Sequence, residues 1–162
     1  MTPLYTDGEI KLHLARVIPK GQPATGNVPV YYYRIQLMDG TEVGRCDLRI
    51  GDNERLMIAG HIGYGVWKDY RGHHYAAKAC RLLLGIARSM GMDHVIITCD
   101  PDNIPSRRTC EALGAELLAI VDVPEDSIDY AMGHLQKCQY RLELRQEETA
   151  AESVGHEEGK DD

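Results

Sequence analysis

Residues able to hold a charged group are concentrated between positions 67 and 78 of the sequence. An apolar stretch ends there, and a loop containing Gly72 leads into a pattern typical of a helix. Unpaired backbone N–H groups at the start of a helix, together with its dipole, bind anions. Four cationic side chains surround this point: Lys68, Arg71, Lys78 and Arg81. The segment predicts a phosphate-binding loop. The alternative is that Gly72 makes an ordinary turn and the bases form a solvated face.

Two better-known phosphate motifs do not fit this segment. The dinucleotide motif G-x-G-x-x-G could begin at Gly63, but Lys68 occupies the place of its last glycine. The chain also has no G-x-x-x-x-G-K-[ST], the loop of one large class of nucleotide hydrolases. The sequence therefore argues against both of these nucleotide-binding folds.

The elements that must position the loop follow from hydrophobic periodicity. Alternating or short apolar runs predict seven strands, at residues 10–18, 30–38, 41–50, 61–67, 94–99, 116–123 and 137–144. Apolar spacings of three and four predict a helix over 75–90 and a second from a cap at Asp102 or Asn103 to about 113. Residues 124–135 are expected to form a loop or a short helix. This order predicts an α/β or α+β fold with a mixed sheet and a strand–helix–strand crossover near residues 61–99.

Composition and charge limit the remaining classes. The 162 residues fit one domain, 43% of them are apolar, and no apolar run is long enough to cross a membrane. The five cysteines form no CxxC pair and no secretory signal precedes them, which predicts reduced thiols and a cytoplasmic protein. Residues 145–162 hold seven acids and two bases of a chain with net charge −7. We expect a single domain over residues 1–144, an acidic disordered tail over 145–162, and no nucleic-acid partner, because the body lacks a basic excess.

Several short motifs, in the right order, resemble the GNAT acetyltransferases. The run Arg71-Gly72-His73-His74-Tyr75-Ala76 looks like their acetyl-CoA loop, R/Q-x-x-G-x-G/A. Residues 102–106 look like the family's N-x-x-S/A segment, and residues 111–115 match its E-x-x-G-[AF] ending. Residues 60–66 are similar to the fourth strand of an uncharacterised bacterial subgroup. The resemblance covers about residues 29–144.

The resemblance implies an N-acetyltransferase with a mostly antiparallel sheet of about seven strands and a central strand–helix–strand–helix unit for acetyl-CoA. An amine of a small molecule or peptide would attack the thioester directly, without a metal. Backbone groups of the fourth strand would bind the pantetheine and the acetyl carbonyl, and the loop would bind the pyrophosphate. The implied cofactor-binding residues are Tyr64, Gly65, Val66, Arg71, Gly72, His73, His74, Tyr75, Ala76, Asn103 and Ser106. The acceptor stays unnamed, and a homodimer is left open.

The chain departs from the family pattern where catalysis would occur. His74 stands in place of the usual loop glycine, and we expect it to keep a negative φ at the helix start. Cys110 stands where many relatives carry a tyrosine that acts as the general acid. Cys110 is either the proton donor or a small core residue. In the second case, water or Tyr140 would donate the proton. His61, beside the usual position of the base, is the first candidate for that role and Asp47 a weaker one.

Other functions compete with acetyl transfer. The residues 20–29 leave no room for the two helices that help most relatives to form an acceptor groove. The missing acid and base favour a CoA-binding regulatory module with little or no catalysis. A metal site built from His61, His73 and His74 is disfavoured, because no Cys or His spacing fits zinc.

Overall fold

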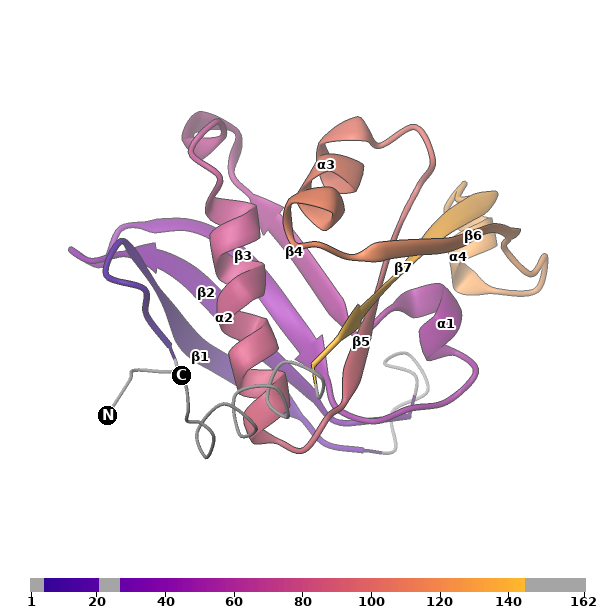
Figure 1. Cartoon of the computed structure of the whole chain (residues 1–162), viewed down its shortest axis with the longest axis horizontal. Coiled ribbons are helices and arrows are strands. Elements are labelled where there is room, and N and C mark those ends of the chain that lie inside the picture. The colour runs from indigo at the N-terminus through magenta and orange to yellow at the C-terminus, as the bar shows by residue number, and fades with distance from the viewer. Residues whose placement is uncertain (1–4, 21–26, 145–162) are drawn as a thin grey trace, which may run out of the picture.

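The computed structural model describes residues 5–20 and 27–144, and it consists of seven strands, four α-helices and one 3₁₀ turn. The expected acidic tail and part of the 20–29 loop lie outside the described residues. In chain order the elements are β1 (Ile10–Ile18), β2 (Val30–Leu37), β3 (Glu42–Arg49), α1 (Leu56–Ala59), β4 (Ile62–Val66), η2 (Lys68–Tyr70), α2 (Tyr75–Ser89), β5 (His94–Cys99), α3 (Ile104–Ala112), β6 (Glu116–Asp122), α4 (Ile128–Ala131) and β7 (Gln136–Glu143) (Figure 1).

The strands form two antiparallel sheets. One has the order β1-β2-β3-β4 and the other the order β5-β7-β6. The sheets meet where β4 and β5 begin, because the backbone N–H of His61 donates to the carbonyl of Ile96 at 2.7 Å. The predicted α+β class with seven mostly antiparallel strands is confirmed. The strands divide into two sheets at the β4–β5 junction rather than forming one.

Helix α2 supplies the centre of the core. Its apolar spacing of three and four places five fully buried residues on one side: Ala79, Cys80, Leu83, Ile86 and Ala87. This side packs against β1, β3 and β4, and α2 crosses the first sheet in Figure 1. Because side chains alternate along a strand, the sheet turns residues such as Ile35 and Leu48 toward the helix and its charged residues away from it. In a chain without phenylalanine, Tyr33 and Tyr140 are the largest buried side chains.

The structure differs from the predicted elements mainly in short segments. Helix α1 and the 3₁₀ turn η2 were not expected, and α4 confirms the short helix within residues 124–135. Asn103 is the N-cap of α3, with its Oδ1 accepting from the Ser106 N–H at 3.2 Å. Among the described residues, no helix is both long and apolar enough to cross a bilayer.

Candidate functional site

The loop before α2 has an unusual backbone. Gly72 has φ +94° and His74 has φ +62°, while His73 between them does not have a positive φ. The expectation that His74 keeps a negative φ is therefore wrong: it occupies the left-handed region, which costs a residue with a Cβ about 1–2 kcal/mol. Such alternation turns successive N–H groups toward one point and forms an anion-binding concavity. At the helix start, His74 thus adopts the left-handed backbone conformation that a glycine would adopt more easily.

The start of α2 leaves its N–H groups open to an anion. His74 is the N-cap, yet no side chain caps the helix there, and no acidic residue lies in the first turn. Gly72 is exposed, and a side-chain carbon at this position would meet no atom within 4 Å. The rings of His73 and Tyr75 stack with their centroids 5.1 Å apart and flank the loop. A phosphate group has both the space and the donors that it requires.

The predicted ring of cations is weaker than the sequence suggested. Arg71 donates through Nε to the carbonyl of Val66 at 3.0 Å, which ties the loop to the end of β4. Lys78 forms an ion pair with Glu9 at 3.1 Å, and Arg81 donates to a carbonyl at the end of α3. Lys68 is exposed on η2. Three of these four side chains are thus already engaged with other groups, and the backbone N–H groups at the start of α2 are the donors that remain for an anion.

His61 joins the two sheets. Its side chain is fully buried; Nδ1 accepts from the backbone N–H of Ile96 at 2.8 Å, so Nε2 carries the proton and donates to the carbonyl of Gly51 at 2.8 Å. Burial lowers the pKa of His61 below its ordinary value. Both nitrogens are occupied and neither reaches solvent. This arrangement counts against His61 as a general base and gives it a structural role at the β4–β5 junction.

Asp47 has the geometry that His61 lacks. It lies on β3 directly opposite Gly63 of β4, and a side-chain carbon at Gly63 would stand only 2.9 Å from its Oδ2. The glycine therefore makes room for the carboxylate beside β4. Burial raises the pKa of Asp47, and Arg49, Arg45 and the Gly63 N–H partly offset this. Its side chain keeps 12% exposure, on the face of the sheet away from α2.

Tyr64 lies on β4, next to Gly63, and its side chain is on the opposite face of the sheet from Asp47. Its hydroxyl meets Ser106 Oγ at 2.6 Å, which links β4 to α3 across the end of β5. Burial raises the pKa of Tyr64, so the phenol keeps its proton. The predicted residues Tyr64, Asn103 and Ser106 are thus brought together, although Asn103 is also used to cap α3.

Three cysteine thiols form a cluster next to Ser106. Cys99 and Cys138 are opposite each other on β5 and β7, and Cys110 of α3 is fully buried. A hydrogen bond between Cys110 and Cys99 raises the pKa of Cys110, and burial raises it further. The same hydrogen bond lowers the pKa of Cys99, against the effect of burial. Cys110 therefore keeps its proton tightly, which counts against it as an acid. The environment of Cys99 could not be predicted from the sequence, because it depends on strand pairing with the distant β7.

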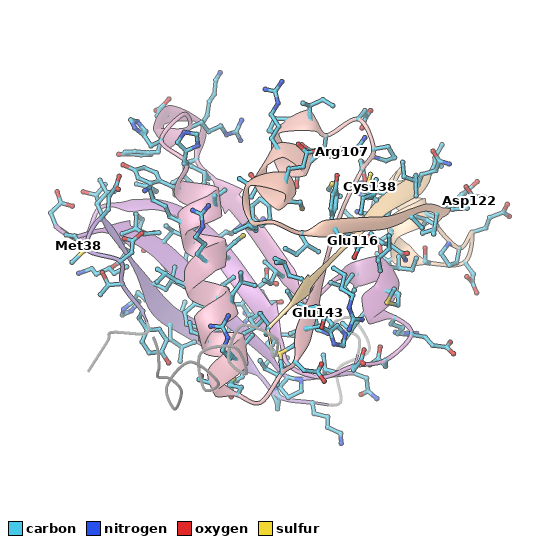
Figure 2. The ribbon with its side chains drawn as sticks, in the orientation of Figure 1. Met38, Arg107, Glu116, Asp122, Cys138 and Glu143 are labelled. Carbon is cyan, nitrogen blue, oxygen red and sulfur yellow. The ribbon has the colours of Figure 1, made fainter. Side chains whose placement is uncertain are left out.

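Tyr140 is also engaged. It is 2% exposed in the middle of β7, and its hydroxyl accepts from Arg107 Nε at 3.0 Å. Arg107 also donates to the Pro101 carbonyl, and Figure 2 labels it on α3 together with Cys138 of β7. The structure brings Tyr140 to the thiol cluster rather than to the loop. Within residues 5–20 and 27–144, no three His, Cys, Asp or Glu side chains are grouped to hold a metal ion.

Known proteins share this fold. A family model described as an acetyltransferase (GNAT) domain matches residues 1–116. No curated protein matches the chain. A GNAT-family acetyltransferase from Bacillus anthracis is 19% identical, with a TM-score of 0.55 over 70% of this chain and 66% of that one. The microcin C7 self-immunity acetyltransferase MccE, in complex with acetyl-CoA and AMP, is 18% identical, with a TM-score of 0.55 over 70% of this chain and 61% of that one. The chain spans less than two thirds of the length of these two.

A further structure matches over nearly its whole length. The ribosomal L7/L12 alpha-N-protein acetyltransferase RimL, in complex with coenzyme A, is 14% identical, with a TM-score of 0.62 over 88% of this chain and 97% of that one. At these identities the structural similarity establishes the fold.

Proposed function

The chain belongs to the GNAT acetyltransferase family, and we propose that it transfers an acetyl group from acetyl-CoA to a primary amine. The observation that carries this proposal is the loop before α2, with positive φ at Gly72 and His74 and a helix start that no side chain caps. The loop is tied by Arg71 to Val66, the last residue of β4, so a phosphate bound there would lie at that end of the strand. The solved relatives that hold acetyl-CoA or CoA support this assignment.

The cosubstrate would extend from the loop along β4. Backbone N–H groups between Gly72 and Ala76 would bind its pyrophosphate, and backbone groups of Tyr64, Gly65 and Val66 would bind the pantetheine. A side-chain carbon at Gly65 would meet no atom within 4 Å, so there is space against the strand at this point. Asn103 and Ser106 at the start of α3 would flank the arm from the other side.

Proton transfer would use the two faces of β4. The attacking amine must lose a proton, its nitrogen forms a bond to the acetyl carbon, the C–S bond breaks, and the CoA thiolate takes up a proton. Asp47, with its raised pKa, is placed beside Gly63 to accept the first proton. Tyr64 keeps its proton and points to the opposite face, where it would donate to the thiolate. The alternation of side chains along β4 thus separates base from acid.

The second candidate function is a CoA-binding module with little or no catalysis. It is favoured by one observation: His61, Cys110 and Tyr140, the residues first expected to catalyse, are buried with their polar atoms engaged. Both functions require CoA binding, and they differ only in turnover.

Thermal unfolding with ligands tests the common part. Saturation at about 100 times the dissociation constant stabilises a fold by roughly 2.7 kcal/mol, which for this size raises Tm by about 5–10 °C. We expect this shift with CoA and acetyl-CoA and a much smaller one with pantetheine. Gly72→Asp should reduce it, because the added charge repels the pyrophosphate. Gly91→Asp is the matched control: this glycine is also exposed and has φ +87°, but it lies at the other end of α2.

The outcomes separate the hypotheses. A folded protein whose Tm does not respond to CoA or acetyl-CoA excludes both functions. A shift that ignores Gly72 and the phosphates means that the site lies elsewhere. Release of free thiol from acetyl-CoA with a panel of amines distinguishes the transferase from the binding module.

A further inference from the structure

The sheet of β1 to β4 has one face that carries all of its Asp, Glu, Lys and Arg side chains. Strand pairing sets Arg16 opposite Tyr32, Arg34 opposite Arg45 and Tyr32 opposite Asp47, so these residues share one side. The other side, against α2, is apolar. We call the charged side the basic face; it consists of Lys11, Arg16, Arg34, Glu42, Arg45, Asp47 and Arg49.

The basic face differs in charge from the rest of the chain. It holds five basic and two acidic side chains, whereas the whole chain has net charge −7. Its two acids already have partners, Asp47 with Arg49 at 3.5 Å and Glu42 with Arg34 at 3.9 Å. Arg16 lies over the ring of Tyr32 at 5.4 Å and Arg45 is exposed. Within the part of the chain that the structure describes, no carboxylate pairs with Arg16 or Arg45.

The basic face leads directly to the proposed reaction site. Arg45 is paired with Gly65, and Asp47 with Gly63, so the positive charges and the proposed base share a side of the sheet. Glycines at both β4 positions leave the strand without side chains there. Neighbouring strands are about 4.8 Å apart, so the face extends about 14 Å from β4 to β1. This distance corresponds to about four residues of an extended peptide.

We propose that the basic face binds the acceptor, and that the acceptor is a peptide with acidic side chains close to its N-terminal amine. The inference rests on the proposed acetyl transfer and adds a substrate class to it. With the amine at Asp47, acidic residues at positions two to five would reach Arg45, Arg34 and Arg16 in turn. A small amine could contact only the charges nearest β4. An α-amine, with a pKa of about 8, also yields its proton to a carboxylate more readily than a lysine does.

Kinetics with three peptides of equal length test the substrate class. The peptides carry Glu, Gln or Arg at positions two to five, and thiol release is measured at saturating acetyl-CoA with the full chain. We expect kcat/KM for the Glu peptide to exceed that for the Gln peptide by about tenfold at low salt, and the preference to decrease at high salt, since exposed charges are screened. The Arg peptide should be the poorest substrate. Equal values for the Glu and Gln peptides would overturn the inference while leaving acetyl transfer in place.

Charge reversal locates the effect. The double variant Arg16→Glu/Arg34→Glu should lower kcat/KM for the Glu peptide at least to the value that the same variant shows for the Gln peptide, so that the preference for acidic side chains is lost. Both residues are exposed, and neither is paired directly with Asp47 in the strand register. Arg141→Glu, a partly exposed arginine on β7 of the second sheet, is the control and should keep the preference. An unchanged preference in the double variant would contradict the assignment to this face.

Direct binding separates this inference from the transferase proposal. Fluorescence anisotropy of a labelled Glu peptide with CoA present should show saturable binding that the double variant weakens by about tenfold or more. Binding without turnover would retain the basic face and reject acetyl transfer. No binding to the intact chain would overturn the inference; the chain's own acidic segment, residues 145–162, would then be the occupant to examine next.

Discussion

Asp47 lies on β3 and His61 directly precedes the neighbouring strand β4, and their surroundings decide what each can do. The imidazole of His61 has a donor on one nitrogen and an acceptor on the other, so no lone pair faces a substrate. The carboxylate of Asp47 is buried beside a glycine but keeps part of its surface exposed. Residue type alone favoured His61, because its ordinary pKa suits a base. The surroundings of the two side chains instead favour Asp47 as the proposed general base.

Replacing Asp47 tests the proposed base. Asp47→Asn keeps the shape but cannot accept the proton, so kcat/KM should fall by about 10²–10⁴-fold. In the wild type, activity should decline as pH falls through the raised pKa of Asp47. That acidic limb should be missing from the residual activity of the variant, measured as a pH–rate profile. The Tm shift with CoA serves as control and should persist. Activity within about twofold of wild type would remove Asp47 from the mechanism.

Replacing His61 tests its structural role. The folded-state pKa of His61 is lowered, so its contribution to stability is present above the unfolded value of about 6.5 and is lost as pH falls through the folded pKa. His61→Ala leaves the Ile96 N–H without its acceptor, which costs about 1–3 kcal/mol at neutral pH. The variant should also lose part of the wild type's destabilisation as the pH falls below about 6.5. Urea unfolding across this range measures both effects; parallel curves for the two proteins would refute the assignment.

At the scale of elements, the loop before α2 combines a strained backbone with the proposed anion binding. His74→Gly removes the cost of a Cβ in the left-handed region and should stabilise the fold by about 1 kcal/mol, or about 2–4 °C in Tm. His74→Ala keeps a Cβ and should give no such gain. Both variants should retain the Tm shift with CoA, because the backbone N–H groups remain. A loss of that shift in both would mean that the imidazole itself contacts the phosphate.

Elements with strong local patterns were predictable. Strands β1 and β5 begin and end where the sequence indicated, and α2 differs by one residue at its end, because periodicity and Gly91 both act locally. Helix α1 was not predictable, since four residues show no periodicity, and its N-cap, Arg55, makes no side-chain capping hydrogen bond. The positive φ of His74 was missed for another reason: the loop geometry overrides the preference of the residue.

The candidate site was predictable only in part. The loop at Gly72 and the residues at the start of α3 were indicated by short motifs that each lie within one segment. The bond between Tyr64 and Ser106, the place of Asp47 beside Gly63, and the thiols around Cys99 all depend on contacts between distant segments. A single sequence shows how apolar and polar residues alternate within each strand, but it does not show which other strand pairs with it. The basic face became visible only when the registers of three strands were known.

At the scale of the whole molecule, the division into two sheets separates the proposed tasks. The first sheet offers its outer face to an acceptor and its inner face to α2, and the second sheet supplies β5 and supports α3. The two meet at the His61–Ile96 link, and the proposed thioester position lies just beyond it. Base and acid approach this position from opposite sides of β4. The site therefore requires both sheets, although most of the charges that would select the acceptor belong to one.

The strand order of the second sheet has a consequence for how the chain emerges from the ribosome. Strand β7 lies between β5 and β6, yet it is synthesised after both. The first sheet and α2 are complete by residue 89 and can assemble early, whereas β5 must wait for residues 136–143 with Val95 and Ile97 unpaired. During this interval a nascent chain presents an apolar strand edge, which favours aggregation and invites a chaperone. A chain truncated before residue 136 would contain α2 and the loop proposed to bind phosphate, but it could not form the second sheet.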